Sequence, residues 1–95
     1  MTTEQMGMCL ELVKESVGLR SHVRDSFLMA NIRGVEKQLT EEQGIALDLD
    51  NHYHLMFLVD FSAWRYKNRD SAEKVPRHLQ FRLHNLIIKS GGAKT

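Results

Sequence analysis

The densest run of possible metal ligands lies near the middle of the chain, where Asp48, Asp50, His52 and His54 alternate with other residues. Carboxylate and imidazole groups are ligands that zinc and other transition metals accept. Two ligands on one helix need a spacing of three or four positions, whereas His52 and His54 would lie about 200° apart around a helix axis. The simpler interpretation is a helix N-cap followed by polar residues of a first turn, so we expect no metal site.

Other residue patterns typical of catalysis do not occur in the sequence. Cys9 is the single cysteine, which excludes a disulfide within the chain and a cysteine-based zinc site, and no neighbour in sequence would lower its pKa. His78 and His84 are six positions apart and would point in different directions on a helix. No His-Glu-x-x-His, Gly-x-Ser-x-Gly or phosphate-binding glycine loop is present. We therefore expect neither enzymatic activity nor a cofactor.

A cluster of basic residues between positions 65 and 82 is the pattern closest to a nucleic-acid site. Asp70 and Glu73 interrupt it, and residues 22–43 mix acids and bases without a basic face. The short turn at residues 18–21 would suit a helix-turn-helix motif. The ordinary interpretation is a solvated face with a few weak ion pairs, and DNA binding stays open as an alternative. The cluster consists of Arg65, Lys67, Arg69, Lys74, Arg77 and Arg82.

Length and composition place the chain among small globular proteins. Its 95 residues predict one domain over residues 1–95 with a short flexible tail at about 90–95. The net charge of +1 is too small to favour nucleic acid or an anionic membrane as the main ligand. The longest apolar run, residues 55–59, is far shorter than the ~20 residues that span a bilayer. We expect a protein that is made and assembled in the cytosol.

The hydrophobic spacing predicts an all-α fold of four helices. No segment alternates apolar and polar residues as a strand would, and apolar residues recur at helical intervals. Gly18 and Gly44 favour helix ends, Ser21 and Asp50 are candidate N-caps, and Pro76 suits a first helical turn. The predicted helices cover residues 3–17, 22–43, 51–69 and 76–89.

The third predicted helix is apolar on almost every side. Three other helices cannot easily cover it in so small a domain, so we expect this helix, or what packs around it, to meet a partner. Gly34 interrupts the second predicted helix, either because another backbone approaches it or because a weak position is tolerated there. The expected core consists of Leu28, Ile32, Val35, Leu55, Leu58, Val59, Leu79, Leu83 and Leu86.

The end of the third predicted helix carries the most distinctive pattern. An apolar helix finishes in an aromatic-x-Asn-Arg-acidic motif, and a short loop and a proline precede the last helix. Together with residues 12–15 and 19–25, this pattern resembles the head–tail connector (adaptor) proteins of tailed bacteriophages over about residues 8–89. The residues that carry the motif are Tyr66, Asn68, Arg69, Asp70 and Pro76.

The resemblance implies a small four-helix connector-type bundle that works as a structural adaptor. Twelve copies would form a ring under the portal protein, extend the DNA channel without binding a specific sequence, and receive a tail-side head completion protein. The protein would then be part of the virion, assembled in the host cytoplasm of a phage or prophage. The alternative is a small helical regulator that binds DNA or another protein.

The resemblance also favours Asn68 and Arg69 as anchors of the loop at residues 70–75, with the loop and the outer faces of the second and fourth helices meeting a neighbouring subunit. Aromatic residues and arginine are common interface anchors, although core packing and helix capping explain them equally well. The interface candidates are Trp64, Arg65, Tyr66, Asn68, Arg69, Asp70 and Pro76.

Overall fold

The fold was analysed in a computed structural model that describes residues 1–71 and 73–89. Within these residues the chain forms four α-helices and one π-helical turn, with no strand, so the all-α four-helix prediction is confirmed. The predicted flexible tail at 90–95 lies outside the described residues. The helices are α1 (Thr3–Val17), α2 (Asp25–Lys37), α3 (His52–Lys67) and α4 (Arg77–Lys89), and the π-helical turn η1 is Gln38–Glu42.

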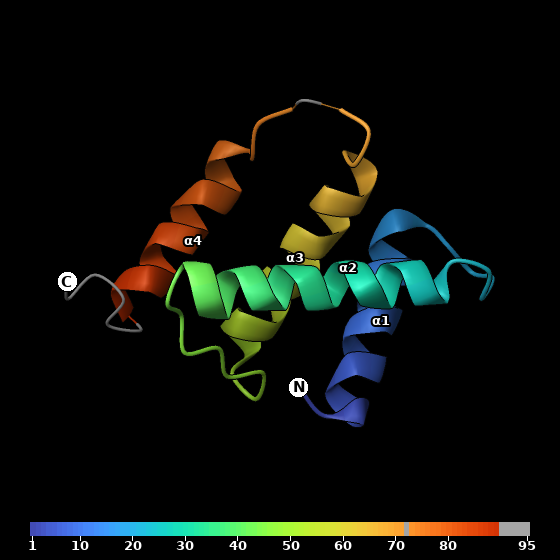
Figure 1. The fold of residues 1–95 in the computed structure, drawn as a ribbon, viewed down its shortest axis with the longest axis horizontal. Helices are drawn as coiled ribbons and strands as arrows, with labels where there is room; N and C mark the ends of the chain where they lie inside the picture. Colours follow the sequence, from blue (N-terminus) through green and yellow to red (C-terminus); the bar gives the residue numbers. More distant parts are fainter. Residues whose placement is uncertain (72, 90–95) are drawn as a thin grey trace.

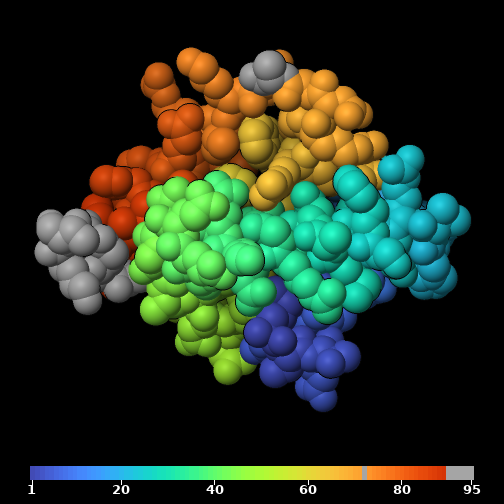
Figure 2. Space-filling model, in the orientation of Figure 1, coloured from blue at the N-terminus to red at the C-terminus, as the bar shows by residue number. Residues whose placement is uncertain are grey.

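Helix α3 lies at the centre of the molecule, and α1, α2 and α4 each pack against it. Figure 1 shows α2 crossing in front of α3 and α1, while α1 and α4 lie on opposite sides of α3. Helix α4 packs on α3 alone among the described elements. In the space-filling view α2 and the segment after it cover the near face, and α1 and α4 remain at its two edges (Figure 2).

The sequence predicts α1 correctly because its ends have strong local signals. The Thr2 hydroxyl accepts from the backbone N–H of Gln5, and the Gln5 side chain accepts from the backbone N–H of Thr2, which is a capping box. At the other end Gly18 adopts φ 78°, a left-handed conformation that favours glycine. These signals position the buried side chains of Met6, Cys9 and Val13 towards the core.

Helix α2 begins at Asp25 and not at residue 22, so the predicted start was wrong. Ser21 does not cap it, because Arg24 occupies the N-cap position and makes no side-chain hydrogen bond there. The predicted end was nearly right, since the helical path continues as η1 to Glu42 before Gly44 turns the chain at φ 70°. The π-helical geometry of η1 was not visible in the hydrophobic spacing.

The caps of α3 and α4 differ from the predictions by one or two residues. Asn51, not Asp50, caps α3, and its side chain accepts a 2.9 Å hydrogen bond from the backbone N–H of Tyr53. Helix α3 ends at Lys67, two residues before the predicted end. Pro76 lies just before α4, and its carbonyl oxygen accepts from the backbone N–H groups of the third and fourth residues after it.

Seven of the nine predicted core residues are buried, and Leu55 and Leu83 are only partly buried at the edge of the core. The three surrounding helices bury most of the middle of α3, from Phe57 to Val59 and from Phe61 to Ala63, and leave Asp60 between them partly exposed. The exposed apolar surface lies elsewhere. Its larger members on the helices are Met8, Phe27, Tyr53, Phe81 and Ile88.

Among the described residues, no helix combines the length and the hydrophobicity needed to cross a membrane.

Candidate functional site

The side chains of Asn68 and Arg69 complete the end of α3. Asn68 is the C-cap residue, and both its backbone N–H and its side-chain amide donate to the carbonyl of Trp64, at 3.0 and 2.9 Å. The Arg69 guanidinium donates to the carbonyl of Tyr66. The bond from Arg69 thus satisfies a carbonyl that a helix end leaves without an intrahelical partner, and the Asn68 side chain adds a second donor to the Trp64 carbonyl. Within the described residues, both side chains therefore bond back to α3 and not to the loop that follows it.

Arg69 also connects α3 to α2 through two aromatic rings. Its guanidinium carbon lies 4.2 Å from the ring centre of Tyr66 and 6.0 Å from that of Phe27. The two rings meet edge to face, with centres 5.8 Å apart. Tyr66 is buried while Phe27 is half exposed, so the stack closes the core beside the first half of α2.

The other candidates from the motif do not form one surface. Trp64 packs edge to face on Phe61 and remains partly exposed. Arg65 reaches across to η1, where its guanidinium donates to the side-chain carbonyl of Gln38 at 3.3 Å. Asp70 is exposed and has no hydrogen bond or ion pair within the described part of the chain. The structure thus brings Tyr66 and Arg69 together. The indole of Trp64 and the carboxylate of Asp70 remain accessible to solvent.

The partly exposed face of Trp64 opens onto a hollow between α1, α3 and α4 with a volume of about 390 Å³. Asp60 and Arg82 border this hollow and form a 2.8 Å ion pair that ties α3 to α4. The Arg82 guanidinium also lies 5.4 Å from the ring centre of Phe57. In the sequence Arg82 belongs to a basic cluster, and this pair could not be predicted because the partner of Arg82 is twenty-two positions away on another helix.

A second polar cluster that sequence reasoning missed lies between α1 and α2. The Lys14 ammonium is 2.9 Å from one oxygen of Asp25, and Nδ1 of His22 is 2.9 Å from the other. Hydrogen bonds from Lys14 first, and from His22 second, hold the pKa of Asp25 below its ordinary value. Lys14 is almost fully buried although it is a lysine, and no local sequence signal marks it because its partner lies across the turn.

The residues at positions 48–54 form local turn contacts. The Asp48 carboxylate accepts from the backbone N–H of Asp50 at 3.0 Å, and the backbone N–H of Asp48 donates to Nδ1 of His54. No group of three or more His, Cys, Asp or Glu side chains in the described ranges is arranged to hold a metal. Cys9 is fully buried, and burial together with the nearby Glu36 carboxylate raises the pKa of its thiol. A raised pKa makes a thiol a poor nucleophile at neutral pH.

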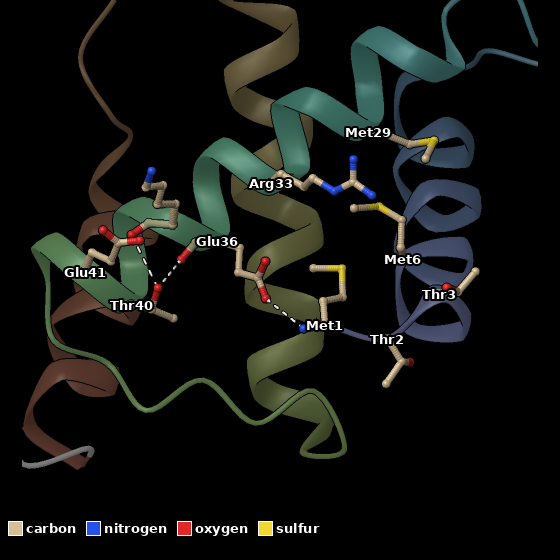
Figure 3. A pocket seen from close by; sticks show the side chains of 10 residues that line it. Met1, Thr2, Thr3, Met6, Met29, Arg33, Glu36, Thr40 and Glu41 are labelled. Carbon is tan, nitrogen blue, oxygen red and sulfur yellow. Dashed lines mark hydrogen bonds and ion pairs between the residues drawn. The ribbon is translucent and has the colours of Figure 1, made fainter.

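One further hollow of about 470 Å³ lies between the start of α1 and the second half of α2. Figure 3 shows that its wall combines the thioether side chains of Met6 and Met29 with the charged side chains of Arg33 and Glu36. The amino group of Met1 lies 3.6 Å from the Glu36 carboxylate across it. Neither a histidine nor a cysteine lines this hollow, and its arrangement suits contact with a side chain better than acid–base chemistry.

Comparison of the chain with protein-family models, with curated proteins and with solved structures found no significant match.

Proposed function

We propose that this chain is a structural adaptor of a tailed phage or prophage, which forms a ring beneath the portal, extends the DNA channel and joins the head to the tail. The observation that carries the proposal is the end of α3. There Tyr66, Asn68 and Arg69 of the aromatic-x-Asn-Arg-acidic motif form one compact unit, in which Asn68 ends the helix and Arg69 stacks on Tyr66, while Asp70 is exposed. The motif through which the sequence resembles connectors is thus a defined structural feature that fixes α3 against α2.

The fold gives the proposal further support. A small chain of four helices with apolar side chains on the outer surface suits a subunit whose stability and role depend on neighbouring copies. Phe27, Phe81 and Ile88 are each about half exposed or more. In a closed ring every copy contributes the same two surfaces, so such side chains are covered without any change in the subunit.

A DNA-binding regulator fits the distribution of charge less well. Three arginines of the basic cluster are engaged inside the subunit, because Arg65 bonds to Gln38, Arg69 stacks on aromatic rings and Arg82 pairs with Asp60. A reader of DNA needs its basic side chains free to reach phosphates and base edges. The remaining basic residues of the cluster lie on the last turn of α3, in the loop after it and on α4.

The proposal is tested by mixing the purified protein with its cognate portal protein. We expect a complex visible by electron microscopy in which twelve copies, about 130 kDa of this chain, form a ring on the portal. The portal of an unrelated phage is the control. The proposal is wrong if no complex forms at high concentration and if deletion of the gene leaves filled heads that still join tails. Sequence-specific binding to duplex DNA that persists at physiological salt would support the regulator instead.

A further inference from the structure

The outer face of α1 is acidic with one apolar residue in its middle. Glu4, Met8, Glu11 and Glu15 fall within a sector of about 60° around the helix axis. All four side chains are exposed, and Met8 is 52% exposed. The sector points directly away from the buried side of the helix, which consists of Met6, Cys9 and Val13.

The outer face of α4 has the opposite character. Arg77, Phe81, His84 and Ile88 also fall within about 60° of one another, on the side away from α3. Phe81 is 66% exposed and Ile88 is 52% exposed. This face therefore presents an aromatic and a β-branched apolar side chain to solvent, together with the cationic guanidinium of Arg77 and the imidazole of His84.

The two faces lie on opposite sides of the subunit. Helices α1 and α4 flank α3 without contacting each other, and α2 crosses in front of α1 and α3 on the near face (Figures 1 and 2). One subunit therefore cannot bring its own acidic face to its own basic face. A second copy placed beside the first can.

We propose that the outer face of α4 docks against the outer face of α1 of a second copy of this chain. The inference rests on the proposed function in one respect, because this contact would be the one that repeats around the ring. Phe81 and Ile88 would pack around Met8, and Arg77 and His84 would lie against the row of glutamates. Because the two faces differ, each copy keeps one of each kind free, and the contact continues until a ring closes.

The charges of the isolated subunit favour such a partner. Glu11 and Glu15 are four positions apart on α1, a spacing at which two like charges destabilise a helix. Neither forms an ion pair within the described residues, and the same holds for Arg77 on α4. Bringing a basic face to the acidic one relieves this repulsion. The apolar part of the contact is small, so we expect a dissociation constant on the order of 0.1–1 mM at low salt.

A charge-swap experiment tests the contact. One variant carries Glu11→Lys with Glu15→Lys, and a second carries Arg77→Glu with His84→Glu. In each variant by itself, the α1 face of one copy meets an α4 face of the same charge on the next copy. Each variant should therefore self-associate at least tenfold more weakly than the wild type. Sedimentation velocity at millimolar concentration and low salt measures this association. Mixed in equal amounts, the two variants present opposite faces at both contacts, and association should return. Circular dichroism checks that each variant is folded.

The control is Glu41→Lys with Glu42→Lys, two exposed acids on η1, which changes the net charge as much as the first variant does. It should self-associate like the wild type. The inference is wrong if the wild type stays monomeric at millimolar concentration and low salt, if the control weakens association equally, or if the folded variants do not recover when mixed.

The failure of this contact and the failure of the adaptor function give different results. If the wild type forms a ring on the portal and both charge-reversed variants do so equally well, the contact is wrong and the function stands. If the charge-swap pair behaves as expected and the portal binds no ring, the function is wrong and the contact stands.

Discussion

The ammonium nitrogen of Lys14 lies 2.9 Å from Oδ1 of Asp25, and this ion pair joins the last turn of α1 to the first turn of α2. The Lys14 side chain is 5% exposed and the Asp25 side chain is 24% exposed, so the positive charge is the more deeply buried of the two. Loss of the carboxylate would leave a buried ammonium without its counter-ion, which is a costly state. Loss of the lysine would leave a partly exposed carboxylate whose other oxygen still contacts His22.

We therefore expect Asp25→Asn to lower the free energy of unfolding more than Lys14→Met does. Methionine keeps the length of the lysine stem and buries no charge, so it suits the site. The double variant should be more stable than Asp25→Asn alone. Urea denaturation at pH 7 measures all three changes, and an equal loss from the two single variants would contradict the order of burial.

The Asp25 carboxylate also makes the free energy of unfolding depend on pH. Lys14, and then His22, hold the pKa of Asp25 below its ordinary value in the folded protein. The unfolded chain therefore takes up this proton at a higher pH than the folded chain does. The stabilisation from Asp25 is complete above its ordinary pKa, near pH 4, and is lost as the pH falls through the lower folded value. The difference in unfolding free energy between the wild type and Asp25→Asn should shrink below about pH 4 in denaturant titrations.

Gly34 offers a site for stabilisation. Among the described residues, a Cβ atom placed there would meet only the Arg65 guanidinium, at an ordinary distance of 3.8 Å, and no backbone of another element lies within 4 Å of it. Of the two explanations for this glycine, the tolerated weak position is the one that the structure supports. Gly34→Ala should raise the free energy of unfolding by about 0.5–1 kcal/mol, because alanine restricts the unfolded chain and favours the helix.

Gly18→Ala is the matched control for that variant. Gly18 also has open space around it, but its φ of 78° is strained for any residue with a Cβ atom. Gly18→Ala should therefore lower the free energy of unfolding by about 1 kcal/mol. Equal effects of the two substitutions in thermal or chemical melts would show that backbone conformation does not decide the outcome here.

Local signals explain what the sequence could predict about this fold. Helix α1 was predicted to the residue, because Gly18 and the preceding apolar spacing act within one turn. The start of α2 was misplaced, because Ser21 looks like a cap while the true first turn is set by Asp25 binding Lys14 on another helix. A contact between two separate helices cannot be predicted from the spacing of apolar residues in either helix.

In the candidate site, too, local contacts could be predicted from the sequence and contacts between separate elements could not. Helix capping by Arg69 was the alternative to the favoured prediction that Asn68 and Arg69 anchor the following loop, and the structure places both side chains on carbonyls of the last turn of α3. The contact of Arg69 with Phe27 could not be foreseen, since the two residues are far apart in sequence. The buried lysine at position 14 was missed for the same reason.

Helix α4 should be the least firmly held of the four. It packs on α3 alone, whereas α1 and α2 also pack on each other. Leu86 is 6% exposed at this contact and Leu83 is only partly buried. Leu86→Ala should cost about 2–5 kcal/mol and Leu83→Ala clearly less, because its cavity opens to solvent. In native-state hydrogen exchange the amides of α4 should exchange faster than those of α3, and equal protection of both helices would contradict this view.

Substitutions of Arg69 distinguish a structural role of the α3 motif from a role in binding a partner. Its guanidinium stacks on Tyr66 and reaches Phe27 while it donates to the Tyr66 carbonyl, so its removal loses one hydrogen bond and two cation–π contacts. Arg69→Ala should lower the free energy of unfolding by about 1–2 kcal/mol. Arg69→Lys should recover only part of this, because a lysine keeps the charge but cannot stack a planar group.

A double-mutant cycle between Arg69→Ala and Phe27→Ala isolates the contact between α3 and α2. We expect a coupling energy of about 0.5–1 kcal/mol in urea denaturation. If both single variants leave the unfolding free energy unchanged and yet abolish binding to the portal, the motif binds a partner and the internal stack does not stabilise the fold. If they destabilise the isolated chain and the folded fraction still binds the portal normally, the motif serves the connector by fixing α3 against α2, and the docking surfaces lie on the outer helices.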